Sequence, residues 1–454
     1  MTKKKKVLGR RNFLEKSATL AATPLVLPWI DTSYITKSTS PKKRIAMVGT
    51  GIRGTEMWGR SLVKEYAEHL EFVALCDANL ERVQFAKKFL GIDVPHYTSD
   101  DFSKMIRETK PDTIIVTTTD CFHAKYISLA LALGCDVISE KPLITEAQQG
   151  QEVLEAEQKS GKKIITTFNA RFGRATEEIK KVLSSGVLGR IISAEFQEYL
   201  DVDHGASYFR RWHGKMRYSG SLLVHKASHH FDQMNWWLDA DPEEVHAFGS
   251  VSFYGKNNSF RHSNCRGCPF SSQCEFYWDI TKDQRMMDLY VACEEADGYL
   301  RDGCVWDNDI DTYDSMTTEV KYTNGVLLSY SLNAFMPYEG QRIAFNCEKG
   351  RLDIRVYARQ PWEVDYSAEF RLTENFKETK TWVVKSGKGG HGGSDKKLKD
   401  LIFLPDQPDP LNQLADSRAG VMSSLIGIAA RSSIETGQSV KIRDLIKFPL
   451  TWGW

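Results

Sequence analysis

The stretch Lys43–Gly54 reads K-R-I-A-M-V-G-T-G-I-R-G, and it decides the expected fold. Its first part, Arg44–Val48, is a short apolar run of the kind that forms a buried strand. Three glycines follow at G-x-G-x-x-G spacing, namely Gly49, Gly51 and Gly54. Because the apolar residues after the glycines recur at helical spacing, the stretch predicts a strand, a tight turn and a helix.

Each glycine has a physical role in a dinucleotide-binding turn. Gly49 permits the tight turn, Gly51 lets backbone N–H groups approach a pyrophosphate, and Gly54 lets the helix pack close to the strand. The next strand candidate is followed by Asp77, at the distance expected for a contact with a ribose hydroxyl. The sequence therefore predicts a dinucleotide site, and its expected contacts here are Gly49, Thr50, Gly51, Ile52, Arg53, Gly54, Asp77 and Arg82.

Asp77 also bears on the choice between NAD and NADP. Its carboxylate would repel a 2′-phosphate, which favours NAD. Arg82 is close in the sequence and weakens that preference. NAD is the expected cofactor, with NADP as the alternative.

Length and charge exclude some classes of function. The chain has 454 residues, enough for two or three domains, and 60 basic side chains balance 59 acidic ones. A formal net charge of +1 gives no field that would attract nucleic acid. No apolar run is long enough for a spanning helix. We expect neither nucleic acid nor a membrane as a partner of the mature protein.

Residues 1–40 resemble a twin-arginine signal peptide and linker. Arg10 and Arg11 precede Asn12-Phe13-Leu14 and then an apolar stretch over 18–30. This export route carries folded proteins, so the cofactor would be loaded before export. The prediction is a periplasmic protein with a tightly held cofactor, or a cytoplasmic one if the signal is not used.

The rest of the chain shows two patterns of predicted secondary structure. Strands and helices alternate over 41–167, which predicts an α/β Rossmann domain with a parallel sheet. Residues 168–454 predict an α+β domain with a mostly antiparallel, open-faced sheet. We expect a Cys-rich insertion at 256–310, a loop at 385–399 and a C-terminal helix at 412–437.

Three further motifs carry a family resemblance. They are S-E-K-P-L at 139–143, L-S-S-G-V-L-G-R-I-I at 183–192 and S-G-S-L-L at 219–223. Together with the glycine turn they resemble the Gfo/Idh/MocA family, the glucose–fructose oxidoreductase and inositol dehydrogenase group. The resemblance implies hydride transfer between a nicotinamide and a sugar, polyol or keto-sugar, and sheet faces that often pair into homo-oligomers.

The resemblance also implies roles for particular residues. Lys141 would lie beside the nicotinamide and the substrate hydroxyl, and His229 would be the second acid–base residue. His225 stands where the family usually has an aspartate. Further cofactor contacts are expected from Thr118, His123, Glu140 and Asn169.

The two histidines are four residues apart, so we expect them on one face of a helix. That spacing suits metal ligands, but Lys226 between them would repel a cation. We therefore favour acid–base work by His229, together with His225, over a metal site.

The segment 203–213 is dense in groups that recognise polyols or carboxylates. Its aromatic faces and guanidinium forks indicate a site for a small-molecule carbohydrate. The expected substrate contacts are Lys141, Tyr208, Arg210, Arg211, His213, His225, Lys226 and His229.

Four cysteines in the insertion have spacing that differs from the others: Cys265, Cys268, Cys274 and Cys304. Four thiolates could hold one structural zinc. Two disulfides or an iron–sulfur cluster are the alternatives.

Two other functions compete with the exported NAD(P)-dependent oxidoreductase. One is a redox-neutral, NAD-dependent glycosidase or lyase that acts by transient oxidation of a sugar. The other is a non-catalytic sugar-binding protein of the same fold.

Overall fold

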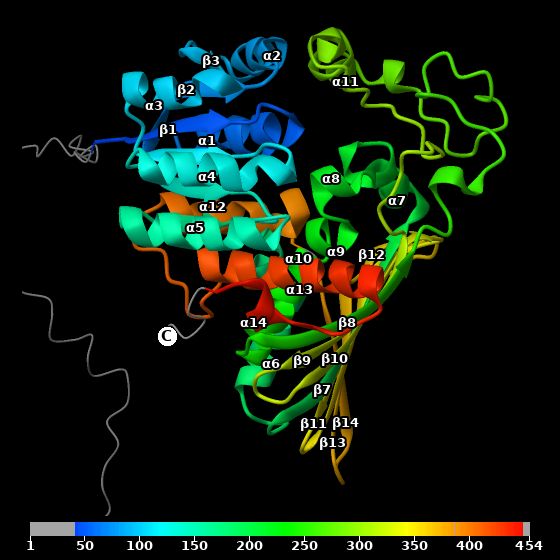
Figure 1. The fold of residues 1–454 in the computed structure, drawn as a ribbon. Helices are drawn as coiled ribbons and strands as arrows, with labels where there is room; N and C mark the ends of the chain where they lie inside the picture. Colours follow the sequence, from blue (N-terminus) through cyan, green and yellow to red (C-terminus); the bar gives the residue numbers. More distant parts are fainter. Residues whose placement is uncertain (1–40, 386, 448–454) are drawn as a thin grey trace, which may run out of the picture. The chain divides into compact units, whose positions relative to one another are not determined.

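The computed structural model describes residues 41–385 and 387–447, and the predicted signal segment lies outside them. Its first layer is a six-stranded parallel sheet in the order β3-β2-β1-β4-β5-β6 (Figure 1). This is the order of a dinucleotide-binding Rossmann domain. The strands are β1 (Lys43–Val48), β2 (Leu70–Asp77), β3 (His96–Thr98), β4 (Thr113–Val116), β5 (Asp136–Ser139) and β6 (Ile164–Thr166).

Helices cover both faces of this sheet. Alternate residues of β1 point to opposite faces, with Ile45 and Met47 in one buried cluster and Ala46 and Val48 in another. The covering helices of this part of the chain are η2 (Arg53–Arg60), α1 (Ser61–Glu65), α2 (Leu80–Leu90), α3 (Phe102–Thr109), α4 (His123–Ala132) and α5 (Ala147–Ser160).

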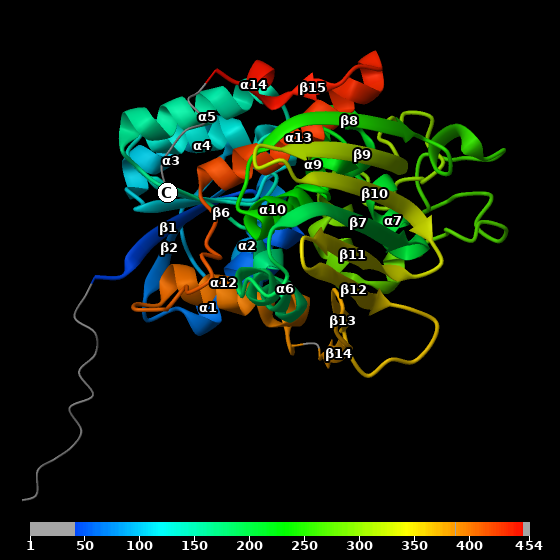
Figure 2. The same cartoon turned by 90° about the horizontal axis from the view of Figure 1, so that it is seen from below.

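The second layer is a nine-stranded sheet in the order β14-β13-β12-β11-β7-β10-β9-β8-β15, whose strands lie side by side in Figure 2. Only β7 and β10 pair in parallel, so the predicted mostly antiparallel sheet is confirmed. The strands are β7 (Ile191–Asp201), β8 (Pro242–Ser250), β9 (Ser315–Tyr322), β10 (Leu327–Met336), β11 (Glu339–Cys347), β12 (Gly350–Arg359), β13 (Ala368–Glu374), β14 (Thr379–Val384) and β15 (Val440–Lys441).

One face of this sheet is buried and the other is open. Along β9 buried and exposed residues alternate, with Glu319 and Lys321 on the exposed side. Helices pack on the buried side, including α10 and α13. The remaining α-helices are α6 (Arg174–Ser184), α7 (Val202–Phe209), α8 (Met216–Ser219), α9 (Leu222–His225), α10 (Ser228–Leu238), α11 (Gln284–Leu289), α12 (Ser394–Phe403), α13 (Ser417–Thr436) and α14 (Ile442–Leu445).

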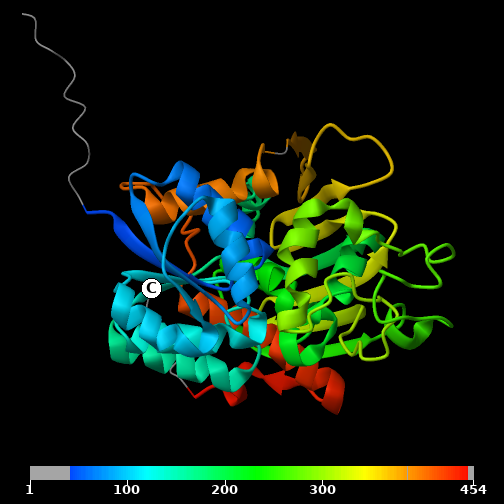
Figure 3. The ribbon, with the colours of Figure 1, turned by 90° about the horizontal axis from the view of Figure 1, so that it is seen from above.

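The insertion reaches the Rossmann domain. Its helix α11 lies beside α2 in Figures 1 and 3, and the two helices are in contact. Arg266 fixes the inside of the insertion through ion pairs to Glu294, at 2.6 Å, and to the fully buried Asp302, at 3.1 Å. The insertion is therefore an ordered cap over the first domain.

Two expectations for the C-terminal part differ from the structure. The predicted loop at 385–399 contains the start of α12, and the predicted helix at 412–437 begins at Ser417. The end of α12 also returns to the Rossmann core, where Phe403 packs against Trp58 and Tyr66 at ring distances of 6.4 and 5.8 Å. These aromatic partners explain why the segment leaves the second sheet.

No helix among the described residues is long and apolar enough to cross a membrane.

Candidate active site

A cavity of about 1410 Å³ lies at the carboxyl ends of the parallel strands. Residues that follow β1, β4 and β5 form one wall, residues from α7 to α10 form a second, and the insertion forms a third. Ligands of open α/β sheets bind at such strand ends. The structure thus brings most of the predicted cofactor and substrate residues to one place.

The glycine turn is built as its spacing predicts. Gly49 has φ +96°, and a Cβ there would lie 2.5 Å from the main chain of Thr117. A Cβ on Gly54 would lie 2.2 Å from the Gly49 carbonyl oxygen. Gly51 instead faces the cavity, with ordinary space around it. The close packing at Gly49 and Gly54 and the open backbone at Gly51 fit a bound pyrophosphate.

Asp77 ends β2 at the edge of the cavity. One carboxylate oxygen accepts hydrogen bonds from the Thr50 amide at 2.6 Å and the Thr50 hydroxyl at 3.0 Å. The other oxygen accepts from the Asn79 amide at 2.9 Å. Thr50 is fully buried and orients Asp77, while the carboxylate itself reaches the place where a ribose would bind.

Arg82 lines the cavity but is not free to attract a 2′-phosphate. It pairs with Asp297 of the insertion at 2.6 Å and lies over the rings of Tyr290 and Tyr299, at 5.7 and 5.6 Å. Because Asp297 balances its charge, the guanidinium no longer weakens the preference for NAD that Asp77 sets.

Three further contacts join the insertion to the cofactor wall. The Ile52 amide donates to the Tyr290 hydroxyl at 3.0 Å, and the Asn79 side chain donates to the Cys293 carbonyl at 2.7 Å. Arg285 pairs with Glu56 at 2.8 Å. Together with the Arg82–Asp297 pair, these contacts form a latch across the predicted dinucleotide groove.

The remaining predicted cofactor residues hold the wall of the cavity in shape. Glu140 accepts hydrogen bonds from Arg53 and from the Trp58 indole, both at 2.8 Å. Asn169 donates to Asp395 at 2.6 Å. The predicted cofactor residues that line the cavity here are Arg53, Thr118, Glu140 and Asn169.

His123 is tied to the main chain. Its Nδ1 lies 2.7 Å from the Pro142 carbonyl oxygen and its Nε2 lies 3.0 Å from that of Thr118. Burial lowers the pKa of this imidazole. His123 thus joins the loop after β5 to the loop after β4, and it faces the cavity from there.

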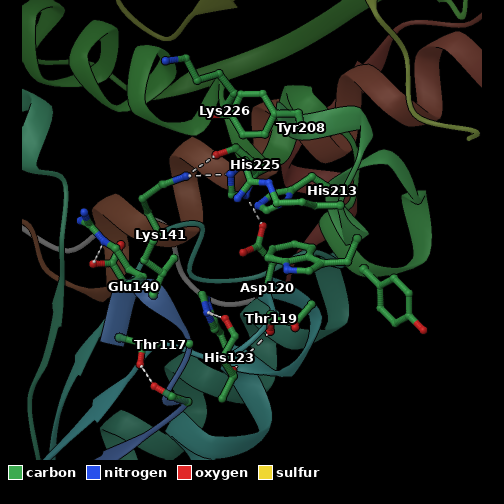
Figure 4. A pocket seen from close by; sticks show the side chains of 18 of the residues that line it. Thr117, Thr119, Asp120, His123, Glu140, Lys141, Tyr208, His213, His225 and Lys226 are labelled. Carbon is green, nitrogen blue, oxygen red and sulfur yellow. Dashed lines mark hydrogen bonds and ion pairs between the residues drawn. The ribbon is translucent and has the colours of Figure 1, made fainter. Parts of the chain in front are cut away.

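Lys141 contacts a histidine that is backed by a carboxylate (Figure 4). Its ammonium donates to the His225 carbonyl oxygen at 2.9 Å and lies 3.4 Å from His225 Nε2. His225 Nδ1 lies 2.5 Å from Asp120 Oδ2. The Rossmann domain thus supplies, from Asp120, the carboxylate that is missing at position 225.

The proton positions follow from the donors. Burial, followed by the charges of Lys141 and Arg211, lowers the pKa of His225, so the imidazole is neutral. A lysine ammonium has only donors, so Nε2 must accept and Nδ1–H must donate to Asp120. Burial likewise lowers the pKa of Lys141 to about 8. A lysine with that pKa exchanges protons near neutrality.

His229 does not share a helix with His225, contrary to the expectation. The helix α9 ends at His225, and α10 begins at Ser228. Both rings still line the cavity. Nδ1 of His229 is buried without a hydrogen-bond partner among the described residues, and so is Nδ1 of His213.

The other predicted substrate residues differ in whether their side chains already have partners inside the protein. Lys226 is held by Glu198 at 3.2 Å, and the guanidinium of Arg210 bonds to Cys265 Sγ and to the Phe276 carbonyl. Tyr208 lies beside two histidine rings that contact each other, with its centroid 5.3 Å from those of His213 and His225. All of them line the cavity, but Lys226 and Arg210 already have partners inside the protein.

The structure does not support the predicted zinc. Among residues 41–385 and 387–447 no group of three or more His, Cys, Asp or Glu side chains is placed to hold a metal ion, and the cysteines there are not in disulfides. Cys265 Sγ instead accepts hydrogen bonds from Arg210 and from the Trp278 amide. The residues concerned are Cys265, Cys268, Cys274 and Cys304.

Sequence reasoning missed several residues of this site. Asp120 follows β4 in a polar loop at a strand end, which was the available signal. Tyr290, Asp297 and Arg301 come from the insertion and carry no local signal, because their partners lie far away in the chain.

Comparison with family models identifies the class of protein. A model described as "Oxidoreductase family, NAD-binding Rossmann fold" matches residues 43–168, and one described as "Oxidoreductase family, C-terminal alpha/beta domain" matches residues 180–442. The chain belongs to the Gfo/Idh/MocA family, as the motifs predicted, and is an oxidoreductase with an NAD-binding domain.

Individual relatives agree with this class. "Putative oxidoreductase YteT" of Bacillus subtilis is 34% identical over 426 residues, covering 89% of this chain and 99% of the relative. D-glucoside 3-dehydrogenase of Escherichia coli is 31% identical over 154 residues, 34% of this chain and 42% of the relative. Inositol 2-dehydrogenase of Salmonella paratyphi B is 27% identical over 206 residues, 45% and 57% respectively. The last two matches span about half of those enzymes.

Solved structures share the fold at low identity. An oxidoreductase from Agrobacterium radiobacter in complex with NAD+, L-tartaric acid and magnesium has TM-score 0.61 at 15% identity, covering 89% of this chain and 100% of that one. Aldose-aldose oxidoreductase from Caulobacter crescentus, complexed with glycerol, has TM-score 0.58 at 15% identity, covering 88% and 100%. These likenesses confirm the two-sheet architecture.

Proposed function

We propose that this protein transfers hydride between a tightly bound NAD and a sugar, polyol or keto-sugar. One observation carries the proposal: the partly buried Lys141 lies beside the dinucleotide groove and contacts His225, which is hydrogen-bonded to Asp120. Such an arrangement suits removal of a hydroxyl proton. Relatives named for action on D-glucosides and inositol support the substrate class.

The residues of the turn and of β2 fit a dinucleotide. The open backbone at Gly51 would approach the pyrophosphate, and Asp77 would bind a ribose hydroxyl. When bound, NAD supplies the hydride acceptor for oxidation or, reduced, the hydride donor. The chain's own residues then manage the proton.

In oxidation the substrate loses a C–H hydrogen as hydride, and its hydroxyl proton passes to neutral Lys141 as the carbonyl forms. The resulting ammonium keeps its contacts to His225, whose Nε2 lies 3.4 Å away. Asp120 holds the His225 ring in this orientation, because it accepts from Nδ1. His229 lines the same cavity and can contact the substrate.

We test the proposal with Lys141→Ala, loaded with NAD and mixed anaerobically with a panel of sugars and polyols. The expected result is a fall of about 10²-fold or more in the single-turnover rate of NADH formation. Lys163→Ala is the control, because this lysine is exposed on the same domain. Undiminished turnover by Lys141→Ala would contradict the assigned role.

Export by the twin-arginine route is part of the proposal, on the basis of Arg10 and Arg11. The latch supports a cofactor that travels with the enzyme, since four contacts close the groove. Periplasmic protein that has been dialysed should still release nucleotide on denaturation, as measured by mass spectrometry. Loss of nucleotide on dialysis would contradict cofactor retention.

The same latch favours a second candidate, a redox-neutral glycosidase or lyase that oxidises a sugar transiently and then restores NAD. Oxidation at one carbon acidifies its neighbour, elimination follows, and the hydride is returned. Aryl glycosides distinguish the candidates. Release of the phenol without net NADH indicates the redox-neutral reaction, and NADH without phenol indicates the dehydrogenase.

A further inference from the structure

Four arginines that line the cavity form no ion pair with a carboxylate among the described residues: Arg210, Arg211, Arg217 and Arg301. Arg210 is held by Cys265 Sγ and the Phe276 carbonyl, and Arg217 lies over the ring of Tyr218. Arg211 follows α7, and Arg301 comes from the insertion. Arg211 Nε donates only to the Ser207 carbonyl, at 2.5 Å, and Arg301 Nε is buried with no hydrogen-bond partner. In the part of the chain that the structure describes, neither guanidinium forms an ion pair with a carboxylate.

Other partly buried cations of the cavity have acidic partners. Arg53 pairs with Glu140 at 2.8 Å, Arg82 with Asp297 at 2.6 Å, and Lys226 with Glu198 at 3.2 Å. The protein therefore pairs some cations of the cavity with carboxylates and leaves others, including Arg211 and Arg301, without one among the described residues. Since a partly buried charge without a partner is costly, a ligand anion is a natural partner for these two.

The two guanidiniums act on each other. Burial and then the charge of Arg301 lower the pKa of Arg211 to about 10, so Arg211 remains positive at neutral pH. Two like charges close together attract an oxyanion more strongly than either alone, and each guanidinium can bind two oxygens at once.

Arg211 lies toward the substrate end of the cavity. It is 5.5 Å over the ring of Tyr208, whose ring is 5.3 Å from that of His225. His225 in turn contacts Lys141. Arg301 lies over Tyr290 at 5.2 Å, and the Tyr290 hydroxyl accepts from the Ile52 amide at the glycine turn. The pair thus lies between the acid–base residues and the turn, and an effect on NAD affinity distinguishes a substrate oxyanion from the pyrophosphate.

We propose that Arg211 and Arg301 together bind an oxyanion carried by the substrate, which makes the substrate a sugar acid or a sugar phosphate and not a neutral sugar. The inference rests on the proposed function and specifies its substrate class. The recognised chemistry is a carboxylate or phosphate group attached to the sugar that is oxidised at the Lys141 end.

The test is calorimetric titration of the NAD-loaded protein with D-galacturonate, D-galactose 6-phosphate and D-galactose, and with the matching three glucose compounds. We expect one acidic form to bind about tenfold or more tightly than its neutral parent. Whether the carboxylates or the phosphates are preferred identifies the oxyanion. Arg301→Gln and Arg211→Gln should remove that preference and leave NAD affinity unchanged. Arg371→Gln, an exposed arginine on β13, is the control.

A probe without stereochemistry guards against a wrong choice of sugar. Inorganic phosphate should bind the NAD-loaded protein, and the double variant Arg211→Gln/Arg301→Gln should lose that binding. Arg301→Gln should also keep or raise the melting temperature, because it removes charge repulsion. That result shows that the variant folds.

Three outcomes would overturn the inference: equal affinity for acidic and neutral sugars, no phosphate binding by the parent protein, or loss of NAD affinity in place of acid preference. The proposed function has a separate failure. If neutral sugars reduce NAD in the single-turnover assay without any preference for acids, only the inference fails. If no acidic or neutral sugar reduces NAD, the proposed function fails.

Discussion

The two ends of the cavity are built in different ways. At the cofactor end, the turn at Gly49 and the carboxylate of Asp77 belong to one strand–turn–helix–strand unit and are held by short-range packing. At the substrate end, Asp120, Lys141 and His225 come from three separate segments. One end is therefore a local backbone device, and the other is an assembly of distant side chains.

The two ends also differ in whether their charged groups have partners inside the protein. Near the cofactor, the charges of Arg53 and Arg82 are paired with carboxylates, although Arg82 Nε has no hydrogen-bond partner among the described residues. Near the substrate, Arg211 and Arg301 form no ion pair in the part of the chain that the structure describes. The two ends therefore differ in how their charges are balanced before a ligand arrives.

The largest expected effect breaks the substrate end alone. Asp120→Asn should lower kcat by about 10²-fold, because His225, which contacts Lys141, loses the carboxylate that fixes its tautomer and orientation. Steady-state kinetics and NAD titration measure this, with Asp93→Asn as an exposed control.

The pH profile of the Asp120→Asn variant separates an electrostatic role from a purely structural one. The Asp120 charge raises the pKa of Lys141, so its removal should move the pH inflection of oxidation to lower pH. An unmoved inflection with reduced kcat would contradict the proposed coupling.

The second effect separates the structural role of the glycine turn from its role in cofactor binding. Gly49→Ala should cost about 3 kcal/mol or more of unfolding free energy, because φ is +96° and the new Cβ would meet the Thr117 main chain. Gly51→Ala is the matched variant: its Cβ would lie 3.4 Å from the Tyr290 hydroxyl, so stability should change by less than about 1 kcal/mol. Chemical denaturation measures both. Equal costs would refute the distinction.

The third effect is a pH dependence with opposite signs in the two directions. The pKa of Lys141 is lowered to about 8, and the neutral amine accepts the proton in oxidation. Oxidation should therefore rise about tenfold from pH 7 to pH 9, while reduction, which needs the protonated amine, should fall. Rates by cofactor absorbance in both directions test this, and parallel profiles would exclude Lys141 as the titrating group.

The smallest effect concerns the latch that joins the two ends. Asp297→Asn and Tyr290→Phe should each raise the NAD dissociation rate about fivefold, since each removes one contact across the groove. Stopped-flow displacement of bound NADH measures the rate. Glu275→Gln is the control because it is exposed in the same insertion. Unchanged release from both variants would show that the insertion does not retain the cofactor.

Much of the fold was predictable because its signals are local. The apolar run before Gly49, the glycine spacing and the alternating strands are patterns within short windows, and the structure has the corresponding elements. The strands β13 and β14 were missed. The edge strand β14 has no buried residue, and β13 beside it is a short strand whose residues alternate between charged or polar and apolar. The helix α12 was missed for a different reason. The glycine- and lysine-rich residues before it indicate a loop, whereas the helix is stabilised by the packing of Phe403 on Trp58.

The site divides along the same line. By itself the sequence determined the dinucleotide turn, Asp77, the position of Lys141 after β5 and the family, since these depend on residue types at fixed spacing. Only the tertiary structure decided that Asp120 stands behind His225, 105 positions along the chain, and that Tyr290 reaches Ile52 across 238 positions. Contacts of such separation follow from how whole layers pack, and no short-range pattern of residues encodes them.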